Sequence, residues 1–203
     1  MAINPEMLVE QLPPYLKAER KDGFLAALKA FPDCKPIFKK FDDPEPLQGD
    51  CWNGVLFLKF PTGEQKRARA ILLTNSCDAS VQNIRFNPAQ LSFAPVINLE
   101  NYQSKLSKAY SPERVADHIS DIRAQRYTSV FFLPGTGPLN EDCIALLDQI
   151  QSIPLSHFKD DAEVSRLASL SDIGFYLFMF KLSFHFCRFH EDIDRTPEED
   201  CAY

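Results

Sequence analysis

The chain has 203 residues, of which 45% are hydrophobic and 25% are charged, and its formal net charge is −6. This length fits one globular domain, or one domain with an added subdomain, and it allows a substantial buried core. The acidic balance argues against a dedicated nucleic-acid-binding protein, whose surface is usually basic, but it is compatible with a local basic patch.

The cysteine pattern and the apolar segments indicate the cellular compartment in which the protein is expected. The six cysteines form no C-x-x-C pair, and none lies near a histidine pair at zinc-finger spacing. The first ten residues carry acidic side chains and no apolar core, so no signal peptide is expected. The most apolar run, residues 174–186, contains Lys181 and is too short to span a bilayer. The sequence therefore predicts a cytoplasmic protein with reduced thiols, no cofactor, no metal site and no membrane partner.

Residues 1–48 are interpreted as a helical accessory segment. Apolar residues recur at helical spacing over residues 22–31, where Pro32 ends the pattern, and residues 5–12 are a shorter candidate helix. A connector rich in proline and acidic residues then leads into residues 49–203, which are interpreted as a barrel-like domain.

The first half of that domain alternates between strand patterns and turn patterns. Residues 51–60 are predicted to be a strand, residues 61–69 a charged loop, and residues 70–74 a short buried strand. Residues 75–80 are predicted to be a turn because Asn, Ser and Asp side chains satisfy nearby backbone groups. Residues 91–99 follow as a third strand.

Two helices are predicted in the second half. A serine, a proline and an acidic residue at 111–113 are typical of a helix start, and they predict an inserted helix over residues 112–126. Strands are expected at 128–133 and 143–150. The longest helix is predicted over residues 171–191, and its narrow polar stripe indicates burial in the protein's own core or against another chain.

Four short motifs follow one another between residues 49 and 100. They are Gly49-Asp50-x-Trp52, Gly63-Glu64-Gln65-Lys66-Arg67, Arg69-Ala70-Ile71-Leu72-Leu73 and Ala94-Pro95-Val96-Ile97. In this order they resemble the MazF/PemK group of toxin ribonucleases. Members of that group have a small SH3-like β-barrel, usually dimerise, and in many cases cleave single-stranded RNA without a metal.

The resemblance implies an α+β fold, in which a small SH3-like (MazF/PemK-like) β-barrel carries N-terminal helices and a Phe-rich C-terminal helix. It also matches Arg69 to the family's catalytic arginine. The family's usual Arg-Pro is Arg69-Ala70 here, and the family's catalytic threonine is matched by Ile97, which has no hydroxyl and is followed by Asn98. The resemblance therefore supports the barrel more strongly than the nuclease.

A basic stretch and a polar corner are the candidate functional residues. Lys59, Lys66, Arg67 and Arg69 can contact phosphates and stabilise a phosphorane-like transition state, although a solvated hairpin loop has the same composition. The corner consists of Asn75, Ser76, Cys77 and Asp78. A thiolate at Cys77 is a nucleophile where a cation lowers its pKa; the alternative is a small buried cysteine beside an Asx-type cap from Asp78.

Histidines offer two weaker possibilities. His118 stands between Asp117 and Asp121 on a predicted helix and can serve as a base, but an exposed amphipathic helix explains these residues as well. Cys187 and His190 are three residues apart on the Phe-rich helix, where core packing is the better explanation, since two ligands do not make a metal site.

Two function hypotheses follow. In the first, this is a MazF/PemK-like barrel protein of a bacterial toxin–antitoxin or phage-defence system, which binds single-stranded RNA or cleaves it as a metal-independent endoribonuclease. Its catalytic residues would be Arg69, Cys77 and Asp78, and its nucleic-acid-binding residues Lys59, Lys66, Arg67, Asn75 and Ser76.

In the second hypothesis, the protein is a non-catalytic docking or regulatory module that binds a protein partner or a second copy of itself. The missing threonine and the acidic charge favour the second hypothesis, whereas Arg69 and the basic stretch favour the first.

Overall fold

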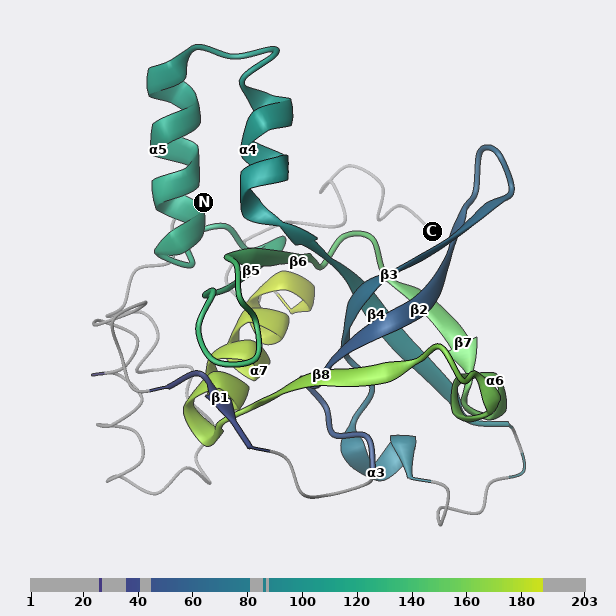
Figure 1. Ribbon diagram of the computed structural model, residues 1–203. Coiled ribbons are helices and arrows are strands. Elements are labelled where there is room, and N and C mark those ends of the chain that lie inside the picture. Colours follow the sequence, from purple (N-terminus) through teal and green to yellow (C-terminus); the bar gives the residue numbers. More distant parts are fainter. Residues whose placement is uncertain (1–25, 27–35, 41–44, 81–85, 87, 188–203) are drawn as a thin grey trace, which may run out of the picture.

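The computed structural model describes residues 26, 36–40, 45–80, 86 and 88–187 (Figure 1). The described strands are β1 (Phe38–Lys39), β2 (Cys51–Lys59), β3 (Glu64–Leu72), β4 (Gln90–Asn98), β5 (Val130–Leu133), β6 (Cys143–Leu146), β7 (Gln151–Pro154) and β8 (Ser165–Leu170). The described helices are α3 (Ser76–Ala79), α4 (Leu99–Leu106), α5 (Pro112–Arg123), α6 (Leu155–Asp160) and α7 (Asp172–Phe186). The predicted α+β class is confirmed.

The eight described strands form one antiparallel sheet in the order β1-β8-β2-β3-β4-β6-β5, and β7 pairs with the first half of β4. Backbone pairing does not join the two ends of this order, so the described strands are not closed into a barrel. A side chain links two of them instead. Gln151 of β7 accepts a hydrogen bond from the Leu58 N–H of β2 at 2.8 Å and donates one to the Leu58 carbonyl at 2.7 Å. The sheet therefore curves enough for β7 to reach β2 across β3 and β4.

Each face of the sheet packs against a core of its own, since successive side chains along a strand point to opposite faces. Ile71 faces a core that includes Phe131, Leu177 and Phe178, which we call the α7-side core. Its neighbours Ala70 and Leu72 face the α6-side core, made of Trp52, Val55, Phe57, Ala70, Leu72, Ala79, Leu91, Phe93, Leu155 and Phe158. Full burial of one large apolar side chain stabilises the fold by about 1.5–3 kcal/mol.

The Phe-rich helix α7 begins at the N-cap Ser171, whose hydroxyl accepts a hydrogen bond from the Gly174 N–H at 3.2 Å. Leu177, Phe178 and Leu182 are buried in the α7-side core, in agreement with the predicted burial of this helix. The predicted helix over 171–191 ends at Phe186 in the structure, and its part from residue 188 lies outside the described residues.

Helices α4 and α5 form a hairpin that stands beside the sheet, above β5 and β6 in Figure 1. The predicted start of α5 is confirmed: Ser111 caps the helix by accepting from the Arg114 N–H, and Pro112 is its first residue. Val115, Ile119 and Ile122 pack with residues of β5 and β6, such as Phe132 and Ile144, in a third cluster. Helix α4 was not predicted, since it follows β4 without a loop.

Several sequence-based boundaries are corrected. Residues 61–69 were expected to be a loop, which is wrong for Glu64–Arg69, because these residues pair with β2 and belong to β3. The charged half of β3 lacks the apolar alternation of a half-buried strand, because its side chains are exposed. The strand expected at 143–150 ends at Leu146, and β8 was missed.

The N-terminal segment is described only in part. The helices predicted over residues 5–12 and 22–31 lie outside the described residues, apart from Ala26, which is helical. Phe38 and Lys39 form β1 and pair with β8, so the sheet begins before residue 49. In the described part of the chain, no helix has the length and apolar character needed to cross a bilayer.

Candidate functional site

Strand pairing brings Arg69 together with two other polar side chains. Arg69 of β3 stands opposite Val96 of β4, and Asn98, two residues further along β4, stands opposite Cys143 of β6. The Arg69 guanidinium forms an ion pair with Glu141, and the Asn98 amide donates to the other carboxylate oxygen of Glu141 at 2.7 Å. We call these residues the Arg69–Glu141–Asn98 cluster.

The cluster is charged and open to solvent. Hydrogen bonding to Arg69 lowers the pKa of the Glu141 carboxyl, and the same bond raises the pKa of Arg69, so both are ionised at neutral pH. Burial raises the pKa of the adjacent Cys143 thiol, which lies 3.7 Å from Arg69 Nη1 and is not a thiolate at neutral pH. The Arg69 and Glu141 side chains are 41% and 40% exposed, so a ligand can reach both.

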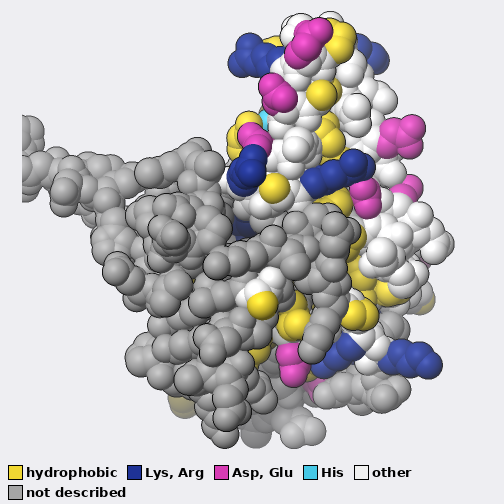
Figure 2. Space-filling model, turned by 90° about the vertical axis from the view of Figure 1, so that its left-hand side faces the viewer, with side chains coloured by type: hydrophobic (Ala, Val, Ile, Leu, Met, Phe, Trp, Pro, Cys, Tyr) yellow, Lys and Arg dark blue, Asp and Glu magenta, His cyan; other side chains and the backbone are white. Residues whose placement is uncertain are grey.

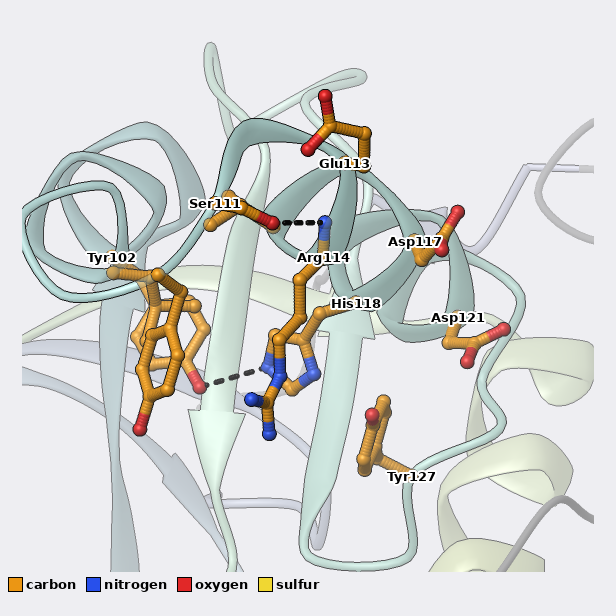
Figure 3. A pocket seen from close by; sticks show the side chains of 11 residues that line it. Tyr102, Ser111, Glu113, Arg114, Asp117, His118, Asp121 and Tyr127 are labelled. Atoms are coloured by element: carbon orange, nitrogen blue, oxygen red, sulfur yellow. Dashed lines mark hydrogen bonds between the residues drawn. The ribbon is translucent and has the colours of Figure 1, made fainter.

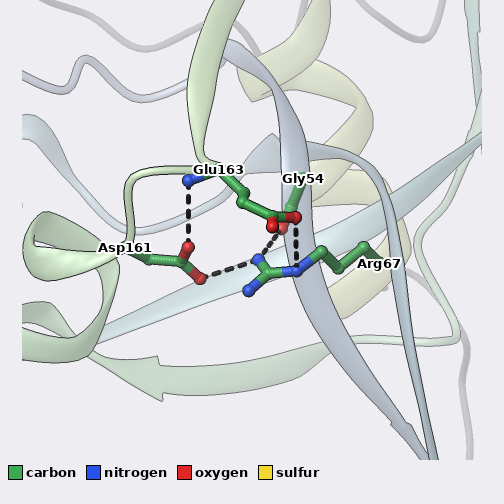
Figure 4. Close-up of polar contacts among 4 residues, drawn as sticks. All are labelled: Gly54, Arg67, Asp161 and Glu163. Carbon is green, nitrogen blue, oxygen red and sulfur yellow. Dashed lines mark hydrogen bonds and ion pairs between the residues drawn. The ribbon is translucent and has the colours of Figure 1, made fainter.

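Carboxylates also neutralise most of the predicted basic stretch. Arg67 pairs with Asp161 at 2.7 Å and with Glu163 at 3.1 Å, and it donates to the Gly54 carbonyl at 2.7 Å (Figure 4). The Asp161 hydrogen bond raises the pKa of the Arg67 guanidinium. Lys59 lies 3.7 Å from Glu64. A phosphate group would have to displace these carboxylates before it could bind Arg67 or Lys59.

Lys66 is the exception in the basic stretch. It is exposed, and none of the described carboxylates pairs with it. It is adjacent in sequence to Arg67, but the side chains of neighbouring strand residues point to opposite faces of the strand. The four predicted cations therefore do not form one continuous basic patch.

The predicted corner lies beyond the other end of β3. About 20 Å of strand separates Lys66 from Leu72, at roughly 3.3 Å per residue, and the corner follows that end. Asn75 caps α3 by accepting a hydrogen bond from the Cys77 N–H at 3.0 Å, and the Ser76 hydroxyl accepts one from the Gln48 N–H at 2.9 Å. The structure thus separates this corner from Lys66, whereas Arg69 lies only about 10 Å from the same end of β3.

Two details of the corner bear on the alternatives weighed from sequence. Cys77 is exposed, so the interpretation of a small buried cysteine is wrong. The side-chain cap at the start of α3 comes from Asn75, while Asp78 lies in the first turn of that helix. The catalytic roles of Cys77 and Asp78 stay predictions.

A pocket of about 690 Å³ lies in the α4–α5 hairpin (Figure 3). Its lining comes from both helices, from the connection between them and from the segment after α5: Tyr102, Leu106, Tyr110, Ser111, Glu113, Arg114, Val115, Asp117, His118, Asp121 and Tyr127. The Tyr102 hydroxyl and His118 Nε2 are 3.1 Å apart and form a hydrogen bond. We call this the α4–α5 pocket.

Burial shifts two titratable groups in the pocket. It lowers the pKa of the His118 imidazole and raises the pKa of the Tyr102 phenol, so both rings are neutral at neutral pH. Sequence reasoning selected His118 on α5 but missed Tyr102 and Tyr127, which come from other segments. The outer surface of the hairpin carries interspersed acidic and basic side chains (Figure 2).

No group of three or more His, Cys, Asp and Glu side chains that could hold a metal ion is found among the described residues. Comparison of the chain with models of protein families and with curated proteins found no match.

Proposed function

We propose that the protein is a MazF/PemK-like barrel protein of a bacterial toxin–antitoxin or phage-defence type system that acts on or binds single-stranded RNA. The observation that carries this proposal is the Arg69–Glu141–Asn98 cluster. Arg69 was selected as the match to a catalytic arginine, and it contacts an ionised carboxylate 72 residues away in the sequence. An arginine and a carboxylate side by side, both open to solvent, can serve phosphodiester chemistry.

The strand order supports the small SH3-like barrel within this proposal. Five antiparallel strands run in the order β8-β2-β3-β4-β7, and the short helix α6 connects β7 to β8. They surround the α6-side core, and the Gln151–Leu58 hydrogen bonds link β7 to β2 where backbone pairing is missing. Helices α4 and α5 are then an insertion into this barrel.

The cluster suggests a metal-independent reaction. Glu141 would take the proton from a ribose 2′-hydroxyl, and the oxygen would attack the adjacent phosphorus while the 5′-oxygen leaves and takes a proton from water. Arg69 would stabilise the negative charge that develops on the phosphoryl oxygens. Asn98 would orient the Glu141 carboxylate. This route replaces the missing threonine with a carboxylate and needs no hydroxyl at Ile97.

A second function, a non-catalytic docking module, is favoured by a different observation. Carboxylates already neutralise Lys59, Arg67 and Arg69, as expected for cations that stabilise a fold rather than wait for phosphate. In this case the surface around these ion pairs would contact a protein partner or a second copy of the chain.

The test is incubation of the purified chain with a mixed single-stranded RNA pool in the presence of a chelator. We expect cleavage by the unaltered protein and its loss in Arg69→Ala and Glu141→Gln. Arg126→Ala is the matched control, because Arg126 forms a similar exposed ion pair with Asp121 outside the cluster.

Binding separates the remaining outcomes. RNA binding without cleavage, weakened by Arg69→Ala, would support the binding half of the proposal. A folded protein that neither cleaves nor binds the pool would overturn it in favour of the docking module. Expression should then leave growth unaffected, whereas a toxin-like nuclease should arrest growth in an Arg69-dependent manner.

A further inference from the structure

Arg114 differs from the other described arginines, because none of the described carboxylates forms an ion pair with it. Each of the others has an acidic partner: Arg67 with Asp161, Arg69 with Glu141, Arg123 with Asp142, Arg126 with Asp121 and Arg166 with Asp50. The Arg114 guanidinium instead lies 4.9 Å from the centre of the Tyr110 ring, at the α4–α5 pocket. A guanidinium stacked on an aromatic ring keeps its N–H donors available for an anion.

The pocket also contains a row of aromatic rings. The His118 ring lies between Tyr102 and Tyr127, with ring centres 5.9 Å and 4.5 Å away. Figure 3 shows Tyr102, Arg114, His118 and Tyr127 directed toward one space, while the carboxylates of Glu113 and Asp117 point away from it. Asp121 also lines the pocket, and its charge raises the pKa of the His118 imidazole against the larger effect of burial. Tyrosine and histidine rings are the side chains on which unstacked nucleobases stack.

We infer that the α4–α5 pocket binds a nucleotide, with the phosphate at Arg114 and the base on the Tyr102–His118–Tyr127 row. A volume of about 690 Å³ fits such a ligand, since pockets for small molecules measure about 300–1,000 Å³. With the base stacked on Tyr127, the neutral His118 ring and the Tyr102 hydroxyl can donate to, and accept from, its edge. The ligand is either a free mononucleotide or one nucleotide of a single-stranded RNA, because both present the same base and phosphate.

An organic cation is the main competing ligand, because tyrosines and carboxylates also line cation sites. The geometry argues against it. The carboxylates of Glu113 and Asp117 point away from the rings, and Asp121 is already paired with Arg126. The Arg114 guanidinium, which is directed into the pocket, would repel a second positive charge. This site lies in the helical hairpin, apart from Arg69 on the sheet, so the inference does not rest on the proposed function.

The test is isothermal titration calorimetry of the full chain, in chelator, with the four ribonucleoside monophosphates, their nucleosides, ribose 5-phosphate and spermidine. We expect one or more mononucleotides to bind with one-to-one stoichiometry and more tightly than the matching nucleoside or ribose 5-phosphate. Tyr127→Ala should weaken binding of nucleotide and nucleoside on the order of tenfold, because it removes a stacking ring.

One surface variant and its control separate the phosphate from the rest of the ligand. Arg114→Ala should reduce the affinity for the mononucleotide to that for the nucleoside and leave nucleoside binding unchanged. Arg123→Ala is the matched control: this arginine lies on the same helix but pairs with Asp142 outside the pocket, so its loss should change neither affinity. Arg114 is exposed, and its replacement should not unfold the chain.

The source of the nucleotide follows from a second titration with a short single-stranded RNA. Tighter binding of the RNA than of any mononucleotide, lost in Arg114→Ala but kept in Arg69→Ala, would identify RNA as the ligand. The inference is overturned if the folded protein binds neither, if Arg114→Ala and Tyr127→Ala leave binding unchanged, or if spermidine or ribose 5-phosphate binds as tightly as the nucleotides.

Discussion

Lys181 of α7 holds Tyr127 of the α4–α5 pocket, since its Nζ donates a hydrogen bond to the Tyr127 carbonyl at 2.6 Å. The same group donates to the Gln125 carbonyl at 2.5 Å. Gln125 has a positive φ of 58° and is buried, and its side-chain amide bonds both backbone groups of Phe132. Hydrogen bonds therefore connect helix α7 to the segment between α5 and β5 and, through Tyr127, to the lining of the pocket.

The first prediction concerns the pH dependence that Lys181 gives to stability. Burial lowers the pKa of its amine from 10.5 to about 7. Between these values the unfolded chain holds more protons than the folded chain, so stability should rise with pH across this window and stay lowest below it. We expect a gain of several kcal/mol from pH 7 to 10 in the unaltered protein relative to Lys181→Met, since each pKa unit is worth about 1.4 kcal/mol.

Urea unfolding of both proteins at a series of pH values measures this difference. Subtracting the curve of Lys181→Met removes the contributions of all other titrating groups. A difference that does not change with pH would show that the Lys181 amine stays charged in the folded protein. At all pH values, Lys181→Met should also increase the mobility of the backbone at Tyr127, because the hydrogen bond to its carbonyl is lost. Hydrogen exchange of the backbone amides around Tyr127, or the nucleotide affinity, would measure this effect.

The second prediction concerns the buried ion pair of Asp50 and Arg166. The two side chains are 1% and 7% exposed and lie 3.2 Å apart, and Arg166 also stacks 4.9 Å from the centre of Trp52 and donates to the Glu45 carbonyl. Removing one partner leaves a buried charge without compensation, so Asp50→Asn or Arg166→Met should cost about 3–5 kcal/mol.

Chemical unfolding of these variants, beside Arg126→Ala, checks the prediction. The exposed Arg126–Asp121 pair should contribute no more than about 1 kcal/mol. Equal losses at the two pairs would contradict the burial argument. The result also tests a structural role for the Gly49-Asp50-x-Trp52 motif, since Asp50 and Trp52 are both buried and both contact Arg166.

The comparison of sequence with structure shows where local patterns suffice. Strand β2 and the start of α5 could be predicted, because apolar runs and a Ser-Pro helix start are local signals. The charged half of β3 could not, because Glu64–Arg69 form a strand only through pairing with β2. Strand β8 is short, and its partners β1 and β2 lie more than a hundred residues away in sequence.

The candidate site divides in the same way. Arg69 could be selected by its place in a motif, but its partner Glu141 could not, because their contact depends on the register of β3, β4 and β6. The carboxylates of Asp161 and Glu163, which neutralise Arg67, also reach it only through the tertiary fold. His118 was visible from the sequence, whereas the rings of Tyr102 and Tyr127 are brought beside it by the helical hairpin.

The third prediction separates binding from cleavage at Glu141. Glu141→Gln removes the charge that holds Arg69, so single-stranded RNA should bind about tenfold more tightly, since a charge-assisted hydrogen bond to phosphate is worth roughly 1.5 kcal/mol. Cleavage should be lost, because the amide cannot accept the 2′-hydroxyl proton. Fluorescence anisotropy at several salt concentrations and the cleavage assay measure the two effects.

The pKa of Glu141 adds a control to this experiment. Because Arg69 lowers it, the ion pair contributes to stability above the ordinary carboxyl pKa, and the contribution is lost as pH falls through the lower, folded-state value. Glu141→Gln should therefore cost stability at neutral pH, by a small amount because the pair is exposed, and make no difference at acid pH, where the carboxyl is protonated. Tighter RNA binding together with full cleavage would show that Glu141 neutralises Arg69 without serving as the base.

The fourth prediction uses His118 as a reporter of the α4–α5 pocket. Burial lowers the pKa of its imidazole below the ordinary value of 6.5, so the unfolded chain takes up this proton first and stability should fall as pH drops through 6.5. A bound phosphate at Arg114 would favour the imidazolium, so a nucleotide should raise the His118 pKa and the nucleoside should not.

NMR titration of the four histidine rings, with His118 assigned through His118→Gln, measures the His118 pKa in the free protein and with each ligand. The Tyr102→Phe variant tests the hydrogen bond alone: it keeps the ring but removes the hydroxyl 3.1 Å from Nε2. A free-protein midpoint at or above 6.5, or equal shifts with nucleotide and nucleoside, would contradict the arrangement of a partly buried ring beside a phosphate-binding arginine.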